Sequence, residues 1–292
     1  MKKLIPYIFV IPPFLFVAIF IAYPLGYSFF LSFSQYNYIY DQVPKLIGLS
    51  QYINLFKADN RFLTALFNTL VFGGVYFFSV MFFSLVIAFV LNELTRGKFF
   101  FQLSTYLPII VPLSLAGVIF VWILDPTFGI FNFLLKKLGF SQLSTINWLG
   151  NYDTALYALV VIKLWKFMGF TVVIFLAGLQ SIPSSLSDAA KVDGANFFQE
   201  KLYVILPNLK EYTLIAALYS IIQAIKIFEL PYVATGGGPG NATLTLYLYA
   251  WRVAFGYFKM GKASAIAYVT AGLIILLTMV VTWTLGERKK EK

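Results

Sequence analysis

The sequence predicts an all-α membrane protein that crosses the bilayer several times. Of its 292 residues, 60% are hydrophobic and only 12% are charged, and the mean hydropathy is +0.81. The apolar residues gather into six runs, most of which reach the ~20 residues that a spanning helix needs. No stretch remains for a separate soluble domain, so we expect a single transmembrane domain over residues 1–292.

We expect one spanning helix in each apolar run, about six in total. The runs cover residues 7–33, 66–91, 103–124, 155–179, 214–228 and 265–285. The first four and the last are long enough to span the bilayer. The fifth is the weakest, because its uninterrupted run is short and Gln223, Lys226 and Glu229 fall within its outer turns. Five spans with a re-entrant segment are the alternative.

Basic residues outside the runs predict the orientation, because basic loops stay in the cytoplasm. The first run continues past Pro24 with no small-residue cleavage site, so we expect a retained helix rather than a signal peptide. An even number of spans puts both ends on one side. Both ends are basic, with Lys2, Lys3, Arg288, Lys289, Lys290 and Lys292. We therefore expect both termini and residues 184–209 in the cytoplasm, and a loop at residues 231–262 outside.

Several residue types that carry chemistry are absent or scattered. The chain has no Cys and no His, which removes thiol chemistry, disulfides and His-based metal sites or proton relays. Its net charge of +10 is spread over loops and both ends, which favours anionic lipid headgroups over nucleic acid. The glycine run at 236–240 lacks the Lys-Ser or Lys-Thr of a phosphate loop. We expect no catalytic residues, no metal site and no cofactor bound by this chain.

A polar interruption at residues 188–209 separates the fourth and fifth runs, and its sequence is DAAKVDGANFFQEKLYVILPNL. Ser185 precedes Asp188 by three residues and Asn196 precedes Gln199 by three, so each pair is a candidate capping box. Gly194 between them can adopt the left-handed conformation that ends a helix, and Pro207 limits the second helix. These residues predict two short helices at an angle. An ordinary amphipathic connector at the membrane surface is the alternative.

This loop resembles the EAA signature of the membrane subunits of ABC importers. The signature runs Glu-Ala-Ala, two variable residues, Asp-Gly-Ala, and a hydrophobic stretch that ends in Leu-Pro. Its counterparts here are Asp188, Ala189, Ala190, Asp193, Gly194, Ala195, Leu206 and Pro207. Asp188 replaces the usual Glu but keeps a carboxylate at a helix start, whereas Lys201 stands where an aromatic residue is common. The resemblance implies that this coupling loop is the socket for the ATPase.

A second segment, FELPYVATGGGPGNATLTLYLYAWRVAF at 228–255, resembles the extracellular segment after the fifth helix of sugar-type ABC permeases. Together with GLSQY at 48–52, NTL at 68–70 and GLQSIP at 178–183, the resemblance covers nearly the whole chain and is to the maltose and glycerol-phosphate class. Pro231 and the glycines argue against a regular helix here. The resemblance implies a contact with the solute-binding protein through Gly236, Gly237, Gly238, Pro239 and Gly240. A flexible turn is the alternative.

The resemblance implies a permease subunit that forms half of the pore of an ATP-driven importer for di- or oligosaccharides. We expect the protein to lie in a bacterial or archaeal cell membrane, and we expect the partner ATPase to bind the ATP and Mg. Its expected partners are a second, different permease chain, an ATPase dimer and an extracellular solute-binding protein. Glycerol phosphate or another anionic sugar derivative is the alternative solute. A secondary transporter that needs no ATPase is the alternative class, although we find no internal repeat typical of one.

Charged residues within the runs need partners or water, because each Lys at a helix centre costs about 2.5–3.5 kcal/mol on insertion scales. Lys163 and Lys166 share one face of the fourth helix. In one interpretation these side chains extend to the outer membrane surface. In the other they line the solute path together with Phe170, Gln223 and Lys226. Gln223 and Lys226 would then donate hydrogen bonds to sugar hydroxyls, and Trp165 or Phe170 would offer a stacking face.

Overall fold

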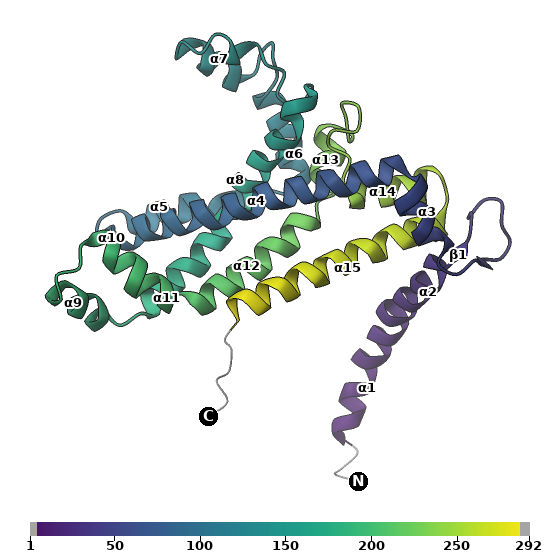
Figure 1. The fold of residues 1–292 in the computed structure, drawn as a ribbon, viewed down its shortest axis with the longest axis horizontal. Coiled ribbons are helices and arrows are strands. Elements are labelled where there is room, and N and C mark those ends of the chain that lie inside the picture. Colours follow the sequence, from purple (N-terminus) through teal and green to yellow (C-terminus); the bar gives the residue numbers. More distant parts are fainter. Residues whose placement is uncertain (1–4, 287–292) are drawn as a thin grey trace. The chain divides into compact units, whose positions relative to one another are not determined.

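A computed structural model describes residues 5–286 of the chain, and these are almost entirely helical (Figure 1). The basic residues at 2–3 and 288–292, on which the predicted orientation depends, lie outside the described residues. The chain divides into two compact units. Unit 1 holds the residues up to Leu63 together with Leu246–Gly272, and unit 2 holds Thr64–Thr245 and the residues from Leu273 onward. That residues 1–292 act as one domain stays a prediction.

Unit 1 is built from the chain's first helices and a segment near its end. Its elements are α1 (Ile5–Val17), a π-helix (Ala18–Ala22), α2 (Tyr23–Ser32), β1 (Ser34–Gln35), β2 (Lys45–Leu46), α3 (Ser50–Ala58), the start of α4 (Asn60–Glu93), α14 (Leu246–Trp251), a second π-helix (Arg252–Gly256) and the start of α15 (Met260–Leu285). The two strands pair antiparallel, with Ser34 opposite Leu46. The side chain of Tyr268 on α15 bonds the backbone carbonyl of Leu25 at 2.7 Å, which attaches α2 to α15.

A half-buried ion pair connects three elements of unit 1. Asp59, which follows α3, accepts hydrogen bonds from Lys262 of α15 and from the Tyr249 hydroxyl of α14, both at 2.7 Å. The backbone N–H of Phe62 also donates to Asp59, at 3.1 Å. Burial raises the pKa of Asp59, but the hydrogen bonds from Lys262, Tyr249 and Phe62 outweigh it and hold that pKa below its ordinary value of 3.8.

Replacing Asp59 with Asn is expected to lower the free energy of unfolding at pH 7 by about 1–3 kcal/mol, because it leaves the Lys262 ammonium without its counter-charge. A lowered pKa contributes stability above the ordinary value, and that stability is lost as pH falls below about 3.8. The variant should therefore lose less stability than the parent between pH 5 and pH 3, a range of roughly two units around that value. Thermal unfolding in mild detergent across this range measures both effects.

Asp125→Asn is the matched control, since the pKa of Asp125 is also lowered, first by the side chain of Thr127, but in an exposed turn. Its effect on stability should be smaller than that of the Asp59 variant, as for most surface substitutions. An Asp59 variant as stable as the Asp125 variant would contradict the account of unit 1.

Unit 2 contains most of the long helices. Its elements after the rest of α4 are α5 (Lys98–Tyr106), a 3-10 helix (Leu107–Ile110), α6 (Leu113–Ile123), α7 (Ile130–Lys137), a 3-10 helix (Leu143–Thr145), α8 (Tyr152–Ser181), α9 (Ser184–Val192), α10 (Phe197–Gln199), a π-helix (Glu200–Ile205), α11 (Leu206–Asn208), α12 (Lys210–Ile225), α13 (Glu229–Ala234) and the end of α15. The Asn151 side chain caps the start of α8 by accepting from the backbone N–H of Asp153. Two apolar clusters run along α8 and hold it against α4 and α12.

Within residues 5–286, five helices are long and apolar enough to cross a membrane, or six if a bent pair counts as one span. The predicted weak fifth span is among the five, because α12 and α13 together give a span of 25 residues, Lys210–Ala234. The interruption falls in the predicted third span instead, where Lys98–Ile110 and Leu113–Ile123 meet at 101°. Val111 there has an extended backbone, which the following Pro112 favours.

Candidate functional site

The coupling loop at residues 184–209 has the two-helix form that its sequence predicts. Helix α9 ends at Val192, and Gly194 follows with a φ of +82°, a left-handed conformation that costs glycine little. Asn196 then caps α10: its side chain accepts from the backbone N–H of Gln199, and the Gln199 side chain accepts from the backbone N–H of Asn196, both at 2.9 Å. The predicted second capping box is therefore confirmed.

Two details of the predicted loop are wrong. Ser185 does not cap the first helix, because α9 already starts at Ser184 behind an extended Pro183 and shows no capping bond from a side chain. Pro207 does not stop the second helix either, since helical backbone continues to Asn208 and α12 begins at Lys210. Pro207 is tolerated because it lies in the first turn of α11, where a missing N–H is not needed.

The residues of the signature divide into an anchored set and an exposed set. Ala190 is buried, and Leu206 packs on the apolar cluster that includes Leu209 of the loop and Phe175 of α8. The residues that remain exposed at the surface of the loop are Asp188, Ala189, Asp193, Gly194 and Pro207, while Ala195 is half-buried. The loop is thus fixed on one side and leaves its bend open on the other. In Figure 1, α9 to α11 lie at the end of unit 2 where α4 ends.

Lys201, the departure from the signature, has a defined place in the loop. Its ammonium pairs with Glu93 at the end of α4 at 2.8 Å and lies 3.8 Å from the carboxylate of Glu200. It also lies over the rings of Phe197 and Phe89, at 5.1 and 5.7 Å from their centroids. A lysine at this position therefore connects the coupling loop to α4 by charge and by cation–π contact, where the signature commonly has an aromatic ring.

The segment after α12 is held by hydrogen bonds, which argues against the alternative of a flexible turn. The Asn68 side chain of α4 donates to the backbone carbonyls of Asn241 and Leu244, at 2.8 and 3.0 Å. The Thr243 hydroxyl donates to the carbonyl of Gly238 at 2.9 Å and lies 2.6 Å from the Thr235 hydroxyl. Pro231, expected to oppose a helix, lies in the first turn of the short helix α13, where proline is tolerated.

The glycine run has the conformations that only glycine adopts cheaply. Gly236, Gly237 and Gly240 have φ values of +55°, +82° and +55°. Gly236 and Gly240 are exposed, Gly238 and Pro239 are half-buried, and Gly237 is buried. The run therefore has a defined backbone conformation, and part of it is exposed at the surface.

The residues predicted to line a solute path lie in two different environments. Lys163 and Lys166 are buried, with 1% and 5% of their surface exposed, and their ammonium groups donate to backbone carbonyls. The interpretation in which they extend to the membrane surface is therefore wrong. Phe170 and Gln223 are half-buried, and Lys226 is exposed where α12 ends.

Tyr219 is a candidate path residue that the sequence reasoning missed. Its ring lies 4.4 Å from that of Phe170, centroid to centroid. It stands one helical turn before Gln223 on α12 and so shares a face with it. An aromatic pair beside an amide is suited to a sugar ring, because the rings stack on C–H faces while the amide bonds hydroxyls. Its spacing from Gln223 in the sequence could have indicated it.

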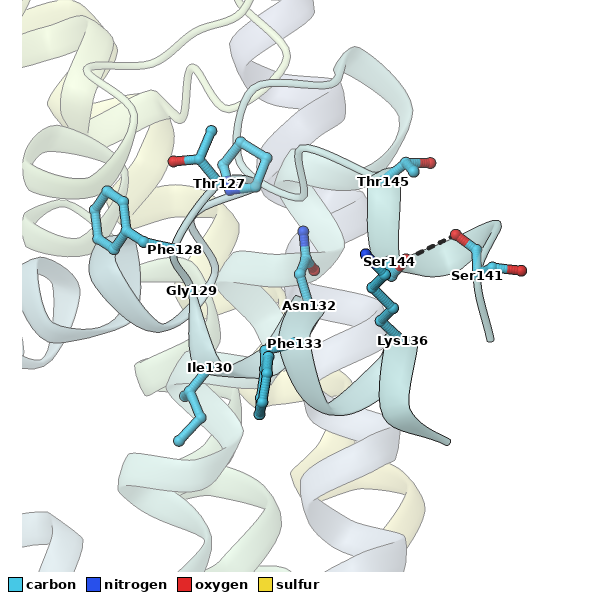
Figure 2. A pocket seen from close by; sticks show the side chains of 11 residues that line it. Thr127, Phe128, Gly129, Ile130, Asn132, Phe133, Lys136, Ser141, Ser144 and Thr145 are labelled. Atoms are coloured by element: carbon cyan, nitrogen blue, oxygen red, sulfur yellow. Dashed lines mark hydrogen bonds between the residues drawn. The ribbon is translucent and has the colours of Figure 1, made fainter. Parts of the chain in front are cut away.

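A cavity of about 740 Å³ lies apart from all the predicted site residues, in the connection between α6 and α8. Figure 2 shows the side chains that line the cavity, among them Phe128, Asn132, Lys136 and Thr145. Asn132 shapes this connection by donating to the carbonyl of Ile146 at 3.0 Å and accepting from the Trp148 indole at 2.7 Å. Residues 5–286 contain no group of three or more acidic residues placed to hold a metal ion.

The profile of one protein family matches most of the chain. It covers residues 60–286, which include all of α4, the coupling loop and α15, and its description is binding-protein-dependent transport system inner membrane component. The chain belongs to this family. It is therefore a membrane component of a binding-protein-dependent transport system, and its several apolar helices are those of a multi-pass permease.

Characterised permeases resemble this one over almost their full length. The trehalose/maltose transport system permease protein MalF of Thermococcus litoralis is 32% identical over 277 residues, which are 94% of this chain and 91% of MalF. The arabinooligosaccharides transport system permease protein AraP of Bacillus subtilis is 33% identical over 293 residues, 99% of this chain and 91% of AraP. Both belong to sugar transport systems, as their names state.

A solved structure has the same fold. The bacterial alginate ABC transporter, crystallised in complex with an alginate pentasaccharide-bound periplasmic protein, matches this permease with a TM-score of 0.83. The match covers 99% of this chain and 96% of the solved chain at 20% sequence identity. The all-α, multi-pass architecture expected from the sequence is confirmed.

Proposed function

We propose that this permease forms one half of the translocation pore of an ATP-driven importer for di- or oligosaccharides. The observation that carries the proposal is the coupling loop: two short helices around an exposed left-handed glycine, anchored on α8 and on the end of α4. Such a loop is built to receive a moving partner and to transmit its motion to the spans. The sugar systems to which MalF and AraP belong support the class of solute.

The ATPase is proposed to dock on the coupling loop from the cytoplasm. The chain has no phosphate loop of its own, so ATP and Mg belong to a separate ATPase dimer. Three large side chains of the loop point away from the protein interior, with 87%, 80% and 71% of their surface exposed: Val192, Phe198 and Tyr203. Exposed charged residues of both signs, Asp188, Lys191 and Asp193, accompany these apolar side chains in the loop.

The opposite ends of the spans are proposed to face the solute-binding protein. The ordered backbone surface at residues 236–240 is the proposed contact, and the alginate transporter crystallised with its periplasmic protein is a precedent for such a complex. In the proposed topology, both termini lie in the cytoplasm of a bacterial or archaeal cell. A second permease chain completes the pore. We propose a different chain rather than a copy of this one.

The solute path is proposed to pass the partly exposed group of Phe170, Tyr219, Gln223 and Lys226. The pair of rings offers a stacking face, while Gln223 and Lys226 supply donors for hydroxyl groups. Lys163 is covered on all sides within unit 2, so its part in the path is not a direct contact with the solute.

Replacing Lys226 with Met is expected to lower uptake about tenfold without loss of assembly, since one donor hydrogen bond to a ligand is worth roughly 1–1.5 kcal/mol. Uptake of radiolabelled sugar by cells that carry the variant measures this effect, and co-purification of the partners measures assembly. Lys137→Met is the control, because Lys137 is an exposed lysine on α7 away from the path. Normal uptake by the Lys226 variant would remove this residue from the path.

The proposal as a whole is tested by reconstituting the permease with its co-purified partners in liposomes. We expect uptake of a di- or oligosaccharide that requires both ATP and the solute-binding protein. Uptake of glycerol phosphate instead would change the solute class but keep the mechanism. Uptake by the permease alone, driven by an ion gradient, would mean that the chain is a secondary transporter.

A further inference from the structure

Two buried lysines of α8 hold the two places where the spans of unit 2 are interrupted. Lys163 donates to the backbone carbonyl of Gln223, in the last turn of α12. Lys166 donates to the carbonyl of Ile109 at 3.0 Å and to that of Val111, where the bent pair of helices meets. The two lysines lie three residues apart, so both ammonium groups leave α8 on the same face.

Each lysine donates to carbonyls at a point where a regular helix stops. The last four carbonyls of a helix lack a partner within that helix, and Gln223 is among the last four of α12. At the bend, Pro112 carries no N–H, so the Ile109 carbonyl lacks the donor that would continue the 3-10 helix, and the extended Val111 holds its own carbonyl outside both helices. Unpaired carbonyls are costly inside a membrane, which makes the lysine side chains an efficient replacement.

The surroundings keep both ammonium groups in place without a paired carboxylate. Lys163 lies over the rings of Phe72 and Tyr76 of α4, at 5.8 and 5.4 Å from their centroids. The ring of Phe167 lies 5.7 Å from Lys163 and 5.1 Å from Lys166. Within residues 5–286, neither lysine forms an ion pair. The aromatic faces, the carbonyl oxygens and the Glu229 carboxylate of α13, which interacts electrostatically with both lysines, together offset the two positive charges.

The segments that follow the two interruptions pack against each other. Gly117 of α6 faces α13 so closely that an added Cβ would lie 3.4 Å from the Leu230 side chain and 3.6 Å from the Cβ of Val233. Helices α6 and α13 therefore form one pair, and each is joined to its longer partner through a break that a lysine of α8 holds. The position of the pair depends on where α8 fixes both breaks.

We infer that Lys163 and Lys166 are positioning residues that fix the α6–α13 pair against α8, and that they do not bind the solute. The transport role in this assignment rests on the proposed function. In the proposed pore, the two lysines set the position of the α6–α13 pair. The lysines act through backbone carbonyls, so either donor can be removed without removing a group that contacts the solute.

The chain has no cysteine, which allows a direct test by disulfide formation. Gly117→Cys with Val233→Cys places two sulfur-bearing side chains on the α6–α13 pair, since the Cβ separation of 3.6 Å lies within the range that disulfides adopt. The rate of oxidation in the purified full-length chain, in mild detergent, reports how firmly the pair is held. It needs neither ATPase nor solute, so its outcome is separate from that of the uptake experiments.

Lys163→Met and Lys166→Met are each expected to slow formation of this disulfide at least fivefold in chains that still elute as the parent does. Lys137→Met, which alters an exposed lysine on α7, should leave the rate unchanged. Lys166→Arg keeps the charge and the donors and should restore most of the parental rate, including where the Met variant fails to fold.

Parental rates in both Met variants would overturn the inference. A Lys166→Arg variant as slow as Lys166→Met would overturn it as well, because the effect would then come from altered packing and not from the lost donor.

Discussion

Replacing Gly194 with Val is expected to uncouple ATP hydrolysis from uptake in the assembled importer. Gly194 has a φ of +82°, where an L-residue is strained by about 1–2 kcal/mol, and a β-branched one by more. The strain displaces the bend between α9 and α10. A free-energy change of about 1–2 kcal/mol corresponds to roughly a tenfold change in rate, so we expect coupled uptake to fall by about that factor. Sugar uptake and ATP hydrolysis measured on the same proteoliposomes give the ratio directly, and hydrolysis should persist while uptake falls.

Gly139 provides the matched control for backbone strain. It has a φ of +89° and, like Gly194, has no atom within 4 Å of the position that a Cβ would take. Gly139→Val therefore introduces the same kind of strain after α7, far from the coupling loop along the chain. The ratio of uptake to hydrolysis should remain that of the parent in this variant. Equal ratios in the two variants would show that the bend at Gly194 carries no coupling.

Replacing Gly169 with Val is expected to cause the largest loss of stability among these variants. Gly169 lies in the middle of α8, and an added Cβ there would collide with the backbone carbonyl of Thr105 on α5. Inserting methylene groups into a packed core costs about 1–3 kcal/mol, and backbone yields less readily than a side chain. We expect a loss of at least about 3 kcal/mol, seen as a lower thermal midpoint and less monodisperse protein in detergent.

Gly74→Val isolates this collision from the general effect of valine in a helix. Gly74 lies inside α4 and has no atom within 4 Å of its Cβ position. Its variant should keep a thermal midpoint close to that of the parent. A Gly169 variant as stable as the Gly74 variant would mean that α5 and α8 are not in contact at this glycine.

The coupling loop was predictable because its shape is local. The capping box of Asn196 and Gln199 and the bend at Gly194 depend on residues within four positions of each other. The predicted cap at Ser185 was wrong because Pro183, two residues earlier, already sets the start of α9. The bend in the third span also had a local indication, since Pro108 and Pro112 flank the break.

The environment of the buried lysines was not predictable, because it depends on contacts between residues far apart in the sequence. Lys163 meets the rings of α4 and the end of α12, and Gln223 is 60 positions away. A sequence alone shows that a lysine within a span needs a partner, but not that the partner is a backbone carbonyl. The pairing of Phe170 with Tyr219 likewise requires the packing of α8 on α12.

The central claim is that this permease works with a separate ATPase, and identifying the proteins that co-purify with it is the most direct test. The full-length chain, tagged and extracted from its native membrane in mild detergent, is analysed by mass spectrometry. We expect a second permease and an ATPase in stoichiometric amounts, with less of both recovered when Val192 and Phe198, two exposed residues of the coupling loop, are replaced by Asp. A permease that purifies alone and transports sugar in liposomes without ATP would contradict the account.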